Sequence, residues 1–171
     1  VFPKATIVGK RAFGSCEKLE GDYYFPTATV IDDHAFVNTF AIDSITADAV
    51  VELLPNYNFE NCSATNISLK SVMNISYGCF QGAKNLQDLT LNSGITNIAG
   101  RAFYNCYFTR ITPTKYYNLQ NLDSEIFSWA SVYNGSIDFK GSTAITVLKN
   151  HIFAGASNFS EIRLPASIIE I

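Results

Sequence analysis

Residues 98–103 read IAGRAF, and this six-residue phrase recurs along the whole chain. The other copies are VGKRAF from Val8, IDDHAF from Ile31, LPNYNF from Leu54, ISYGCF from Ile75, LDSEIF from Leu122 and LKNHIF from Leu148. Each copy ends in a phenylalanine that follows an aliphatic residue by five positions: Phe13, Phe36, Phe59, Phe80, Phe103, Phe127 and Phe153. These phenylalanines are 23, 23, 21, 23, 24 and 26 residues apart. A period of this length indicates a solenoid of stacked turns, called rungs below.

The apolar residues between two phenylalanines keep the same phase in each rung. After Phe80, the apolar positions are Ala83, Leu86, Leu89, Leu91, Ile95 and Ile98. The spacing of two between Leu89 and Leu91 is the period of a β-strand. The mixed spacing around each phenylalanine predicts a tight turn or a short helical turn. A rung cannot bury its apolar row alone, so we expect the strands to stack in parallel, about 4.8 Å apart, around one core.

Three segments resemble the BspA-like, or Treponema-type, leucine-rich repeats. They are AGRAFYNC (Ala99–Cys106), GKRAFGSC (Gly9–Cys16) and IRLPASIIEI (Ile162–Ile171), and the resemblance extends over essentially the whole chain. It implies an α/β repeat solenoid, a right-handed superhelix with a parallel β-sheet on one face and turns or short helices on the other. We therefore expect one solenoid domain, residues 1–171, of about seven rungs of about 23 residues. The family also implies a surface-exposed protein linked to adhesion.

Composition and charge exclude several classes of protein. The chain is 47% hydrophobic and 16% charged, which argues against disorder. Its net charge is −3 and it has no basic run, so nucleic acid is not an expected partner. No stretch approaches the length of about twenty apolar residues that spans a membrane. Neither end reads as a polar cap, so we expect an excerpt of a longer repeat protein, or ends covered by neighbouring subunits or by end-to-end self-association.

The cysteines and histidines do not form a recognisable reactive group. Cys16, Cys62 and Cys106 stand three positions after a repeat phenylalanine, a slot that alanine fills in other rungs, which predicts free, buried thiols. Cys62 and Cys79, on neighbouring rungs, form the one pair for which a disulfide stays open. His34 and His151 are five rungs apart and cannot act as a pair. We therefore expect no catalytic residues, no metal, no cofactor and no enzymatic activity.

Five Asn-x-Ser sequons occur in the chain, where two or three are expected by chance. They start at Asn61, Asn66, Asn74, Asn134 and Asn158. Each is an acceptor of N-linked glycans if a eukaryote secretes the protein, and otherwise a polar loop residue. Both interpretations stay open.

The outward-facing positions of the predicted strands are the candidate binding surface. They are Thr46, Ser68, Asp88, Thr90, Arg110, Thr112, Glu161 and Arg163. Asp88 and Arg110 fall on neighbouring rungs, which predicts an ion pair across the two strands. A solenoid sheet of this kind presents an extended protein-binding surface. The alternative is that small residues with high strand propensity simply face solvent.

These patterns predict a non-enzymatic protein-interaction module for adhesion or recognition, extracellular or at the cell surface. A second hypothesis is a structural component of a larger assembly whose neighbouring chains cover the ends of the solenoid. A weaker hypothesis is carbohydrate binding by exposed aromatic rings, with the candidates Tyr23, Tyr24, Tyr116, Tyr117 and Trp129.

Overall fold

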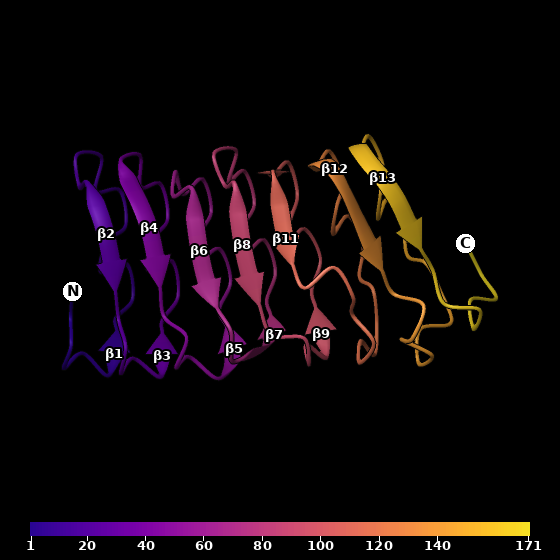
Figure 1. The fold of residues 1–171 in the computed structure, drawn as a ribbon, viewed down its shortest axis with the longest axis horizontal. Coiled ribbons are helices and arrows are strands. Elements are labelled where there is room, and N and C mark those ends of the chain that lie inside the picture. Colours follow the sequence, from indigo (N-terminus) through magenta and orange to yellow (C-terminus); the bar gives the residue numbers. More distant parts are fainter.

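The chain folds as a parallel β-solenoid of about seven rungs (Figure 1). The computed structural model describes residues 1–171, apart from the side chain of Asn134. Each rung contributes one strand to a broad sheet, and most rungs add a short strand to a narrower strip beside it. The rungs follow one another along the long axis, with the two termini at opposite ends (Figure 1).

The broad side of the solenoid carries two parallel sheets. The first contains five strands, in the order β11-β8-β6-β4-β2, and the second contains three, in the order β10-β12-β13. Their bounds are β2 Gly21–Tyr24, β4 Ile42–Thr46, β6 Asn66–Leu69, β8 Asp88–Leu91, β10 Tyr107–Phe108, β11 Arg110–Thr112, β12 Ser131–Asp138 and β13 Ser157–Arg163. The narrow strip consists of β1 Ile7–Val8 paired with β3 Val30–Ile31, and of β5 Glu52–Leu54, β7 Val72–Ile75 and β9 Asn97–Ile98.

The aliphatic residues predicted from the sequence align across the five-stranded sheet. Ile45 pairs with Ile67, Ile67 with Leu89 and Leu89 with Ile111, and all four side chains are buried. Their neighbours in each strand point outward, as the period of two requires. Because equivalent residues of successive rungs pair with each other, every apolar row continues into the next rung. The rows together form one core.

The repeat phenylalanines form a ladder of stacked rings through the solenoid. Successive ring centroids are 5.0, 5.4, 5.2, 5.5, 5.2 and 5.7 Å apart from Phe13 to Phe153, and no interplanar angle exceeds 21°. The five inner rings are fully buried, whereas Phe13 and Phe153 at the two ends are partly exposed. The prediction that these phenylalanines belong to the core is confirmed.

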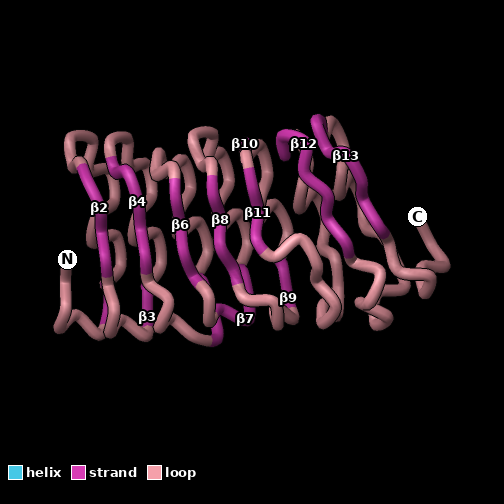
Figure 2. Tube along the Cα trace, in the orientation of Figure 1, coloured by secondary structure: helices cyan, strands magenta, loops and turns pink.

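The prediction of an α/β fold was wrong. Of the two alternatives for the segments around the phenylalanines, turns and short helices, the structure has turns. The structure describes no helix in residues 1–171, and Figure 2 shows only strands and loops. In all seven turns, the residues two before and two after the phenylalanine have positive φ. These values lie between 51° and 72° at residues 11, 15, 34, 38, 57, 61, 78, 82, 101, 105, 125, 129, 151 and 155. Each turn therefore has two left-handed residues four positions apart, which a right-handed helix cannot accommodate.

The turns also form hydrogen bonds that a helix would not allow. The backbone N–H groups of Arg11, Phe13 and Ser15 donate to carbonyls of the next rung, at 3.1, 2.8 and 2.7 Å. The same three positions donate in the central rungs, for example Phe80 to Ala102 at 2.9 Å. Each turn is therefore joined to the next by a ladder, like a strand, and its donors are satisfied between rungs.

The broad side is interrupted between β11 and β12. Strand β11 pairs with β8, whereas β12 pairs with β10 and β13. Pairing of the two rungs resumes where Tyr116 N donates to Asp138 O and Asp138 N donates to Thr114 O, both at 2.8 Å. Between these points β12 diverges from β11 (Figure 1). This break separates the first five strands from the last two.

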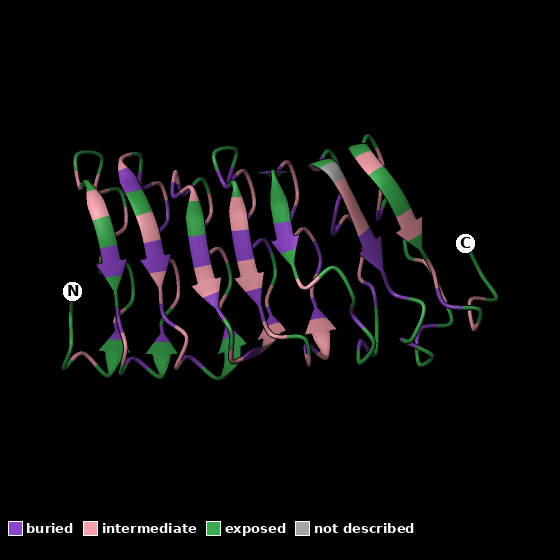
Figure 3. Cartoon of the chain, in the orientation of Figure 1, coloured by how far each residue is buried: buried purple, intermediate pink, exposed green. Residues whose placement is uncertain are grey.

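Large apolar side chains are exposed at both ends of the solenoid. Figure 3 colours the two terminal segments largely as exposed. At the first rung, Phe2 stacks on Phe25 with ring centroids 4.9 Å apart and also lies against Phe13 and Tyr23. Phe2 therefore covers part of the first rung, which the sequence pattern did not reveal. At the other end, Ile169 and Ile171 are largely exposed.

Candidate protein-binding face

The outward side chains of the five-stranded sheet form two straight rows, together called the sheet face below. One row runs through Asp22, Ser44, Asn66, Asp88 and Arg110, and the other through Tyr24, Thr46, Ser68, Thr90 and Thr112. All of these side chains are partly or fully exposed and alternate with buried apolar residues. Six of the eight predicted face residues therefore lie together, in register on neighbouring strands.

Ion pairs and hydrogen bonds tie neighbouring strands of the sheet face. Arg110 Nε lies 2.6 Å from Asp88 Oδ1, which confirms the predicted pair across β8 and β11. Beside the second row, Asp48 accepts hydrogen bonds from Ser68 Oγ at 2.6 Å and from Lys70 Nζ at 2.8 Å. These partly exposed contacts fix side-chain positions more than they stabilise the fold, since surface pairs contribute only about 0–1 kcal/mol.

The network around Asp48 determines its protonation. Burial alone raises the pKa of this carboxyl, but the hydrogen bonds from Lys70 and Ser68 outweigh burial and leave the pKa below its ordinary value. Asp48 therefore stays ionised well into the acid range. Its charge holds Lys70 at the carboxyl end of the sheet face.

Glu161 and Arg163 were predicted to belong to the same face, but the structure places them apart. Both lie on β13, where Glu161 pairs with Ser136 and Arg163 with Asp138 in the three-stranded sheet. Arg163 Nε contacts Glu161 Oε1 at 2.8 Å, and its Nη1 lies 3.8 Å from Asp138 Oδ2. Since β12 diverges from β11, this charged group is separated from the rows that end at Arg110 and Thr112.

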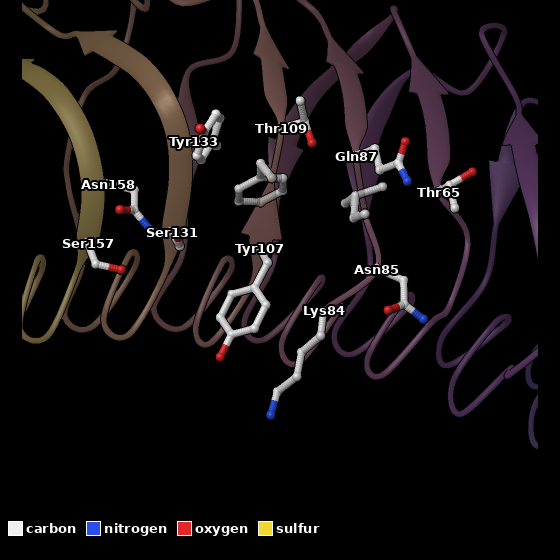
Figure 4. Close-up of a pocket in the computed structure, with 12 residues that line it drawn as sticks. Thr65, Lys84, Asn85, Gln87, Tyr107, Thr109, Ser131, Tyr133, Ser157 and Asn158 are labelled. Atoms are coloured by element: carbon white, nitrogen blue, oxygen red, sulfur yellow. Dashed lines mark hydrogen bonds between the residues drawn. The ribbon is translucent and has the colours of Figure 1, made fainter.

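A hollow of about 720 Å³ opens where the two sheets meet, at the amino ends of the strands (Figure 4). Thr65, Gln87 and Thr109, which immediately precede β6, β8 and β11, line one part. Tyr107 and Lys84 project side by side from neighbouring rungs, with Lys84 Nζ 5.9 Å from the Tyr107 ring centroid (Figure 4). A second hollow of about 410 Å³ lies between β11 and β12 and shares Thr109 and Tyr133 with the first.

The hollow could not be predicted from the sequence because its walls come from five rungs. The available signal was the irregular fifth and sixth rungs, with TPTKYYN after β11 and the insertion around Gly135. An added Cβ at Gly135 would clash with Val132 Cγ1. Glycine thus permits the irregular register between Ser131 and Ser136 of β12.

The sequon asparagines use their side-chain amides in hydrogen bonds. Asn61 donates to Asn38 Oδ1 at 2.9 Å, Asn74 to Glu52 O at 3.1 Å and Asn158 to Ser131 Oγ at 2.9 Å, all between neighbouring rungs. Asn66 donates to Thr65 Oγ1 at 2.9 Å within its own rung. The side chain of Asn134 lies outside the described residues. Whether these sites carry glycans stays a prediction.

All four cysteines are free, including Cys62 and Cys79. Cys62, Cys79 and Cys106 are buried, and burial raises the pKa of each of these thiols. Cys16 is only partly buried, which departs from the prediction of a buried thiol. Cys16 belongs to the first rung, where fewer rungs pack against it.

The two histidines lie in turns far apart. His34 Nδ1 lies 2.8 Å from Asp33 Oδ2, and Lys10 Nζ lies 3.3 Å from the same oxygen. Asp33 therefore contacts both of these basic side chains. Among the described residues, no three His, Cys, Asp or Glu side chains are grouped so as to hold a metal ion. No described helix is long and apolar enough to cross a membrane.

The aromatic residues proposed for sugar binding do not form one surface. Tyr23 and Tyr116 are buried core residues, which excludes them as exposed stacking platforms. Tyr24 lies on the sheet face, Trp129 covers Gly155 in the turns and Tyr117 covers Gly141.

The sequence model of the BspA type leucine-rich repeat region matches residues 6–134 in six copies. The chain belongs to this family. Its repeats form a binding scaffold that is generally non-enzymatic and typical of proteins at the cell surface or secreted, so the chain is a protein-interaction type of module. The match ends within β12, at the irregular register that follows the break in the broad side. No curated protein and no solved structure matches the chain.

Proposed function

We propose that this chain recognises a protein partner outside the cell or at its surface, through the sheet face. The observation that carries the proposal is the regularity of the two outward rows, which stay in register over five strands. Their small polar side chains leave a broad surface that another protein can approach closely. Extended sheet surfaces of this kind serve as binding surfaces in repeat proteins.

Two residues of the sheet face have the chemistry of binding anchors. Tyr24 on β2 is 45% exposed, and the Arg110 side chain on β11 is 69% exposed. Tyrosine and arginine are enriched among the residues that dominate the energy of protein interfaces. They stand at opposite ends of the sheet face, with Thr46, Ser68 and Thr90 between them. We infer that a partner spans most of the five strands and is anchored at both ends.

Site-specific photo-cross-linking tests this function. A benzoylphenylalanine placed at Tyr24 probes the sheet face, and the same probe at Tyr77, a 38% exposed ring in the turns, is the matched control. Each protein is incubated with intact cells and irradiated. We expect a discrete adduct of protein size from position 24 and at least tenfold less from position 77. Equal yields from both positions, or no adduct from position 24, would exclude the sheet face as the recognition surface.

A further inference from the structure

The larger hollow has a lining suited to a polar, ring-shaped ligand. Twelve residues line it, and they present four aliphatic hydroxyls, three carboxamides, two phenols and one ammonium group. The two apolar lining residues, Leu86 and Phe108, are themselves buried core residues. A ligand in the hollow would therefore meet hydrogen-bonding groups and tyrosine rings. Its volume of about 720 Å³ falls within the range of about 300–1,000 Å³ typical of small-molecule sites.

The hydroxyl and carboxamide groups that line the hollow match the hydrogen-bonding groups of a sugar. Each can both donate and accept, as each sugar hydroxyl does. Gln87 and Asn85 stand beside Thr65 and Thr109 along one wall, and Asn158 stands beside Ser131 and Ser157 at the other (Figure 4). Thr65 already bonds Asn66 and Asp43, and Asn158 donates to Ser131 Oγ. An apolar peptide side chain would cut off the exposed carboxamides of Asn85 and Gln87 from water, which is costly. The lining thus favours a saccharide over an apolar peptide.

Two tyrosines supply flat apolar faces at the hollow. Tyr133 is 67% exposed and Tyr107 is 47% exposed. Tyr133 lies in the irregular part of β12, between Val132 and Gly135, where register with β13 is lost. In the same segment the Val132 side chain occupies the space of a Cβ at position 135. The irregular register therefore leaves a large aromatic ring standing in solvent beside a polar hollow.

The charge of the lining further narrows the ligand class. Lys84 is exposed and approaches the Tyr107 ring, and no carboxylate stands among the described residues that line the hollow. Asp88 and Arg110, which line the second hollow, form an ion pair with each other. An ammonium group without a local counter-ion favours an anionic ligand.

We propose that this hollow binds a carboxylated saccharide, with Lys84 pairing the carboxylate and Tyr107 and Tyr133 contacting the sugar rings. The carboxamides and hydroxyls of the two walls bind the sugar hydroxyls. The site differs from the sheet face and does not rest on the function proposed above. Both sites face the same broad side, so the chain can hold a glycan and a protein at adjacent surfaces.

Calorimetric titration with defined sugars tests the proposal. The chain is produced in bacteria, so that Asn158 in the wall carries no glycan. The acidic probes are 3′-sialyllactose and trigalacturonate, and the neutral control is lactose. We expect at least one acidic probe to bind at least tenfold more tightly than lactose, and this preference to weaken as salt is raised. Binding of neither acidic probe, or equal binding of lactose, would overturn the proposal.

Variants locate the binding and exclude a simple charge effect. Lys84→Gln is expected to reduce affinity for the acidic probe at least fivefold, whereas Lys18→Gln, at an exposed lysine of the first rung, leaves it within twofold. Tyr133→Ala is expected to reduce affinity to a similar extent, with an unchanged melting temperature. A tetraglutamate peptide that binds as tightly as the sugar would show recognition of charge alone and would contradict the proposal. Unchanged affinity in both Lys84→Gln and Tyr133→Ala would do the same.

Discussion

The ring of Phe80 stacks on that of Phe59, with centroids 5.2 Å apart and planes inclined by only 7°. This contact joins residues 21 positions apart in sequence and repeats in each rung of the solenoid. Above and below it, backbone N–H groups of the turns donate to the next rung, so ring stacking and hydrogen bonding share one spacing. The strands of the sheet face repeat from rung to rung together with this ladder of rings.

Removing one ring from the ladder should destabilise the whole solenoid. Phe103→Ala leaves a cavity between Phe80 and Phe127, and we expect a loss of about 3–5 kcal/mol in the free energy of unfolding. Urea denaturation measures it. Phe40→Ala is the control, because Phe40 is 56% exposed and outside the ladder. A Phe103→Ala protein within about 0.5 kcal/mol of the parent would show that the ring is not a core residue.

Gly78 should resist substitution for two reasons that can be separated. Its φ is +60°, and an added Cβ would lie 2.6 Å from Cε1 of Tyr57. We expect Gly78→Ala to cost about 1–3 kcal/mol in unfolding free energy. The cost should shrink when Tyr57→Ala is also present, because the steric contact is then gone and the backbone strain remains. Gly9→Ala, with no atom within 4 Å of its Cβ, is the control. Equal costs at the two glycines would refute this description of the turns.

Tyr116 should be more stable as phenylalanine. The ring is buried, and among the described atoms its hydroxyl oxygen has no hydrogen-bond partner. A buried hydroxyl without a partner costs about 1–3 kcal/mol, so Tyr116→Phe should raise the free energy of unfolding. Tyr117→Phe, at the exposed neighbouring ring, should have little effect. A destabilised Tyr116→Phe protein would mean that the hydroxyl is satisfied in solution.

Acid should weaken the solenoid through three paired aspartates. At Asp33, Asp48 and Asp123, burial raises the carboxyl pKa, but hydrogen bonds outweigh it and the folded-state pKa is lowered. A lowered folded-state pKa contributes stability that is present above the unfolded pKa of about 3.9 and lost as pH falls through the folded value. Urea midpoints measured from pH 6 to pH 2 should therefore fall below about pH 4.

Asp48→Asn isolates the contribution of Asp48 to this loss of stability in acid. The variant should lose part of the decrease in stability between pH 4 and pH 2, whereas Asp43→Asn, at an exposed residue of β4, should keep it. An unchanged pH profile for Asp48→Asn would show that its ties to Ser68 and Lys70 are absent in solution.

The regular parts of the fold were readable from the sequence because periodicity carries them. The phase of Phe80, Leu89 and Leu91 fixed both the core and the outward rows, and the Asp88–Arg110 pair followed from it. A tight turn and a short helical turn both stayed open, because spacing alone does not distinguish a helical turn from one with left-handed residues. The missed signal was Asn or Gly two positions after the phenylalanine in most rungs, since these residues tolerate positive φ.

The structure of the irregular rungs could not be predicted from the repeat period. The spacing of 26 residues between Phe127 and Phe153 showed that rung six is enlarged. It did not show that β12 would diverge from β11 and open a hollow. Tyr116 illustrates the difficulty, because its position suggested an exposed ring, whereas the structure buries it against Phe139 at 5.9 Å. Glu161 and Arg163 kept the phase of the outward rows yet fell on the far side of the break.

The affinity of the protein captured from position 24 tests the role of the sheet face most directly. Thr90→Arg places a large charged side chain at the centre of the face, whereas Thr143→Arg makes the same change at an exposed turn. With both variants folded, as judged by melting temperature, Thr90→Arg should raise the dissociation constant at least tenfold, about 1.4 kcal/mol. Thr143→Arg should leave it within twofold. A folded Thr90→Arg protein that binds its partner as tightly as the parent would contradict recognition through the sheet face.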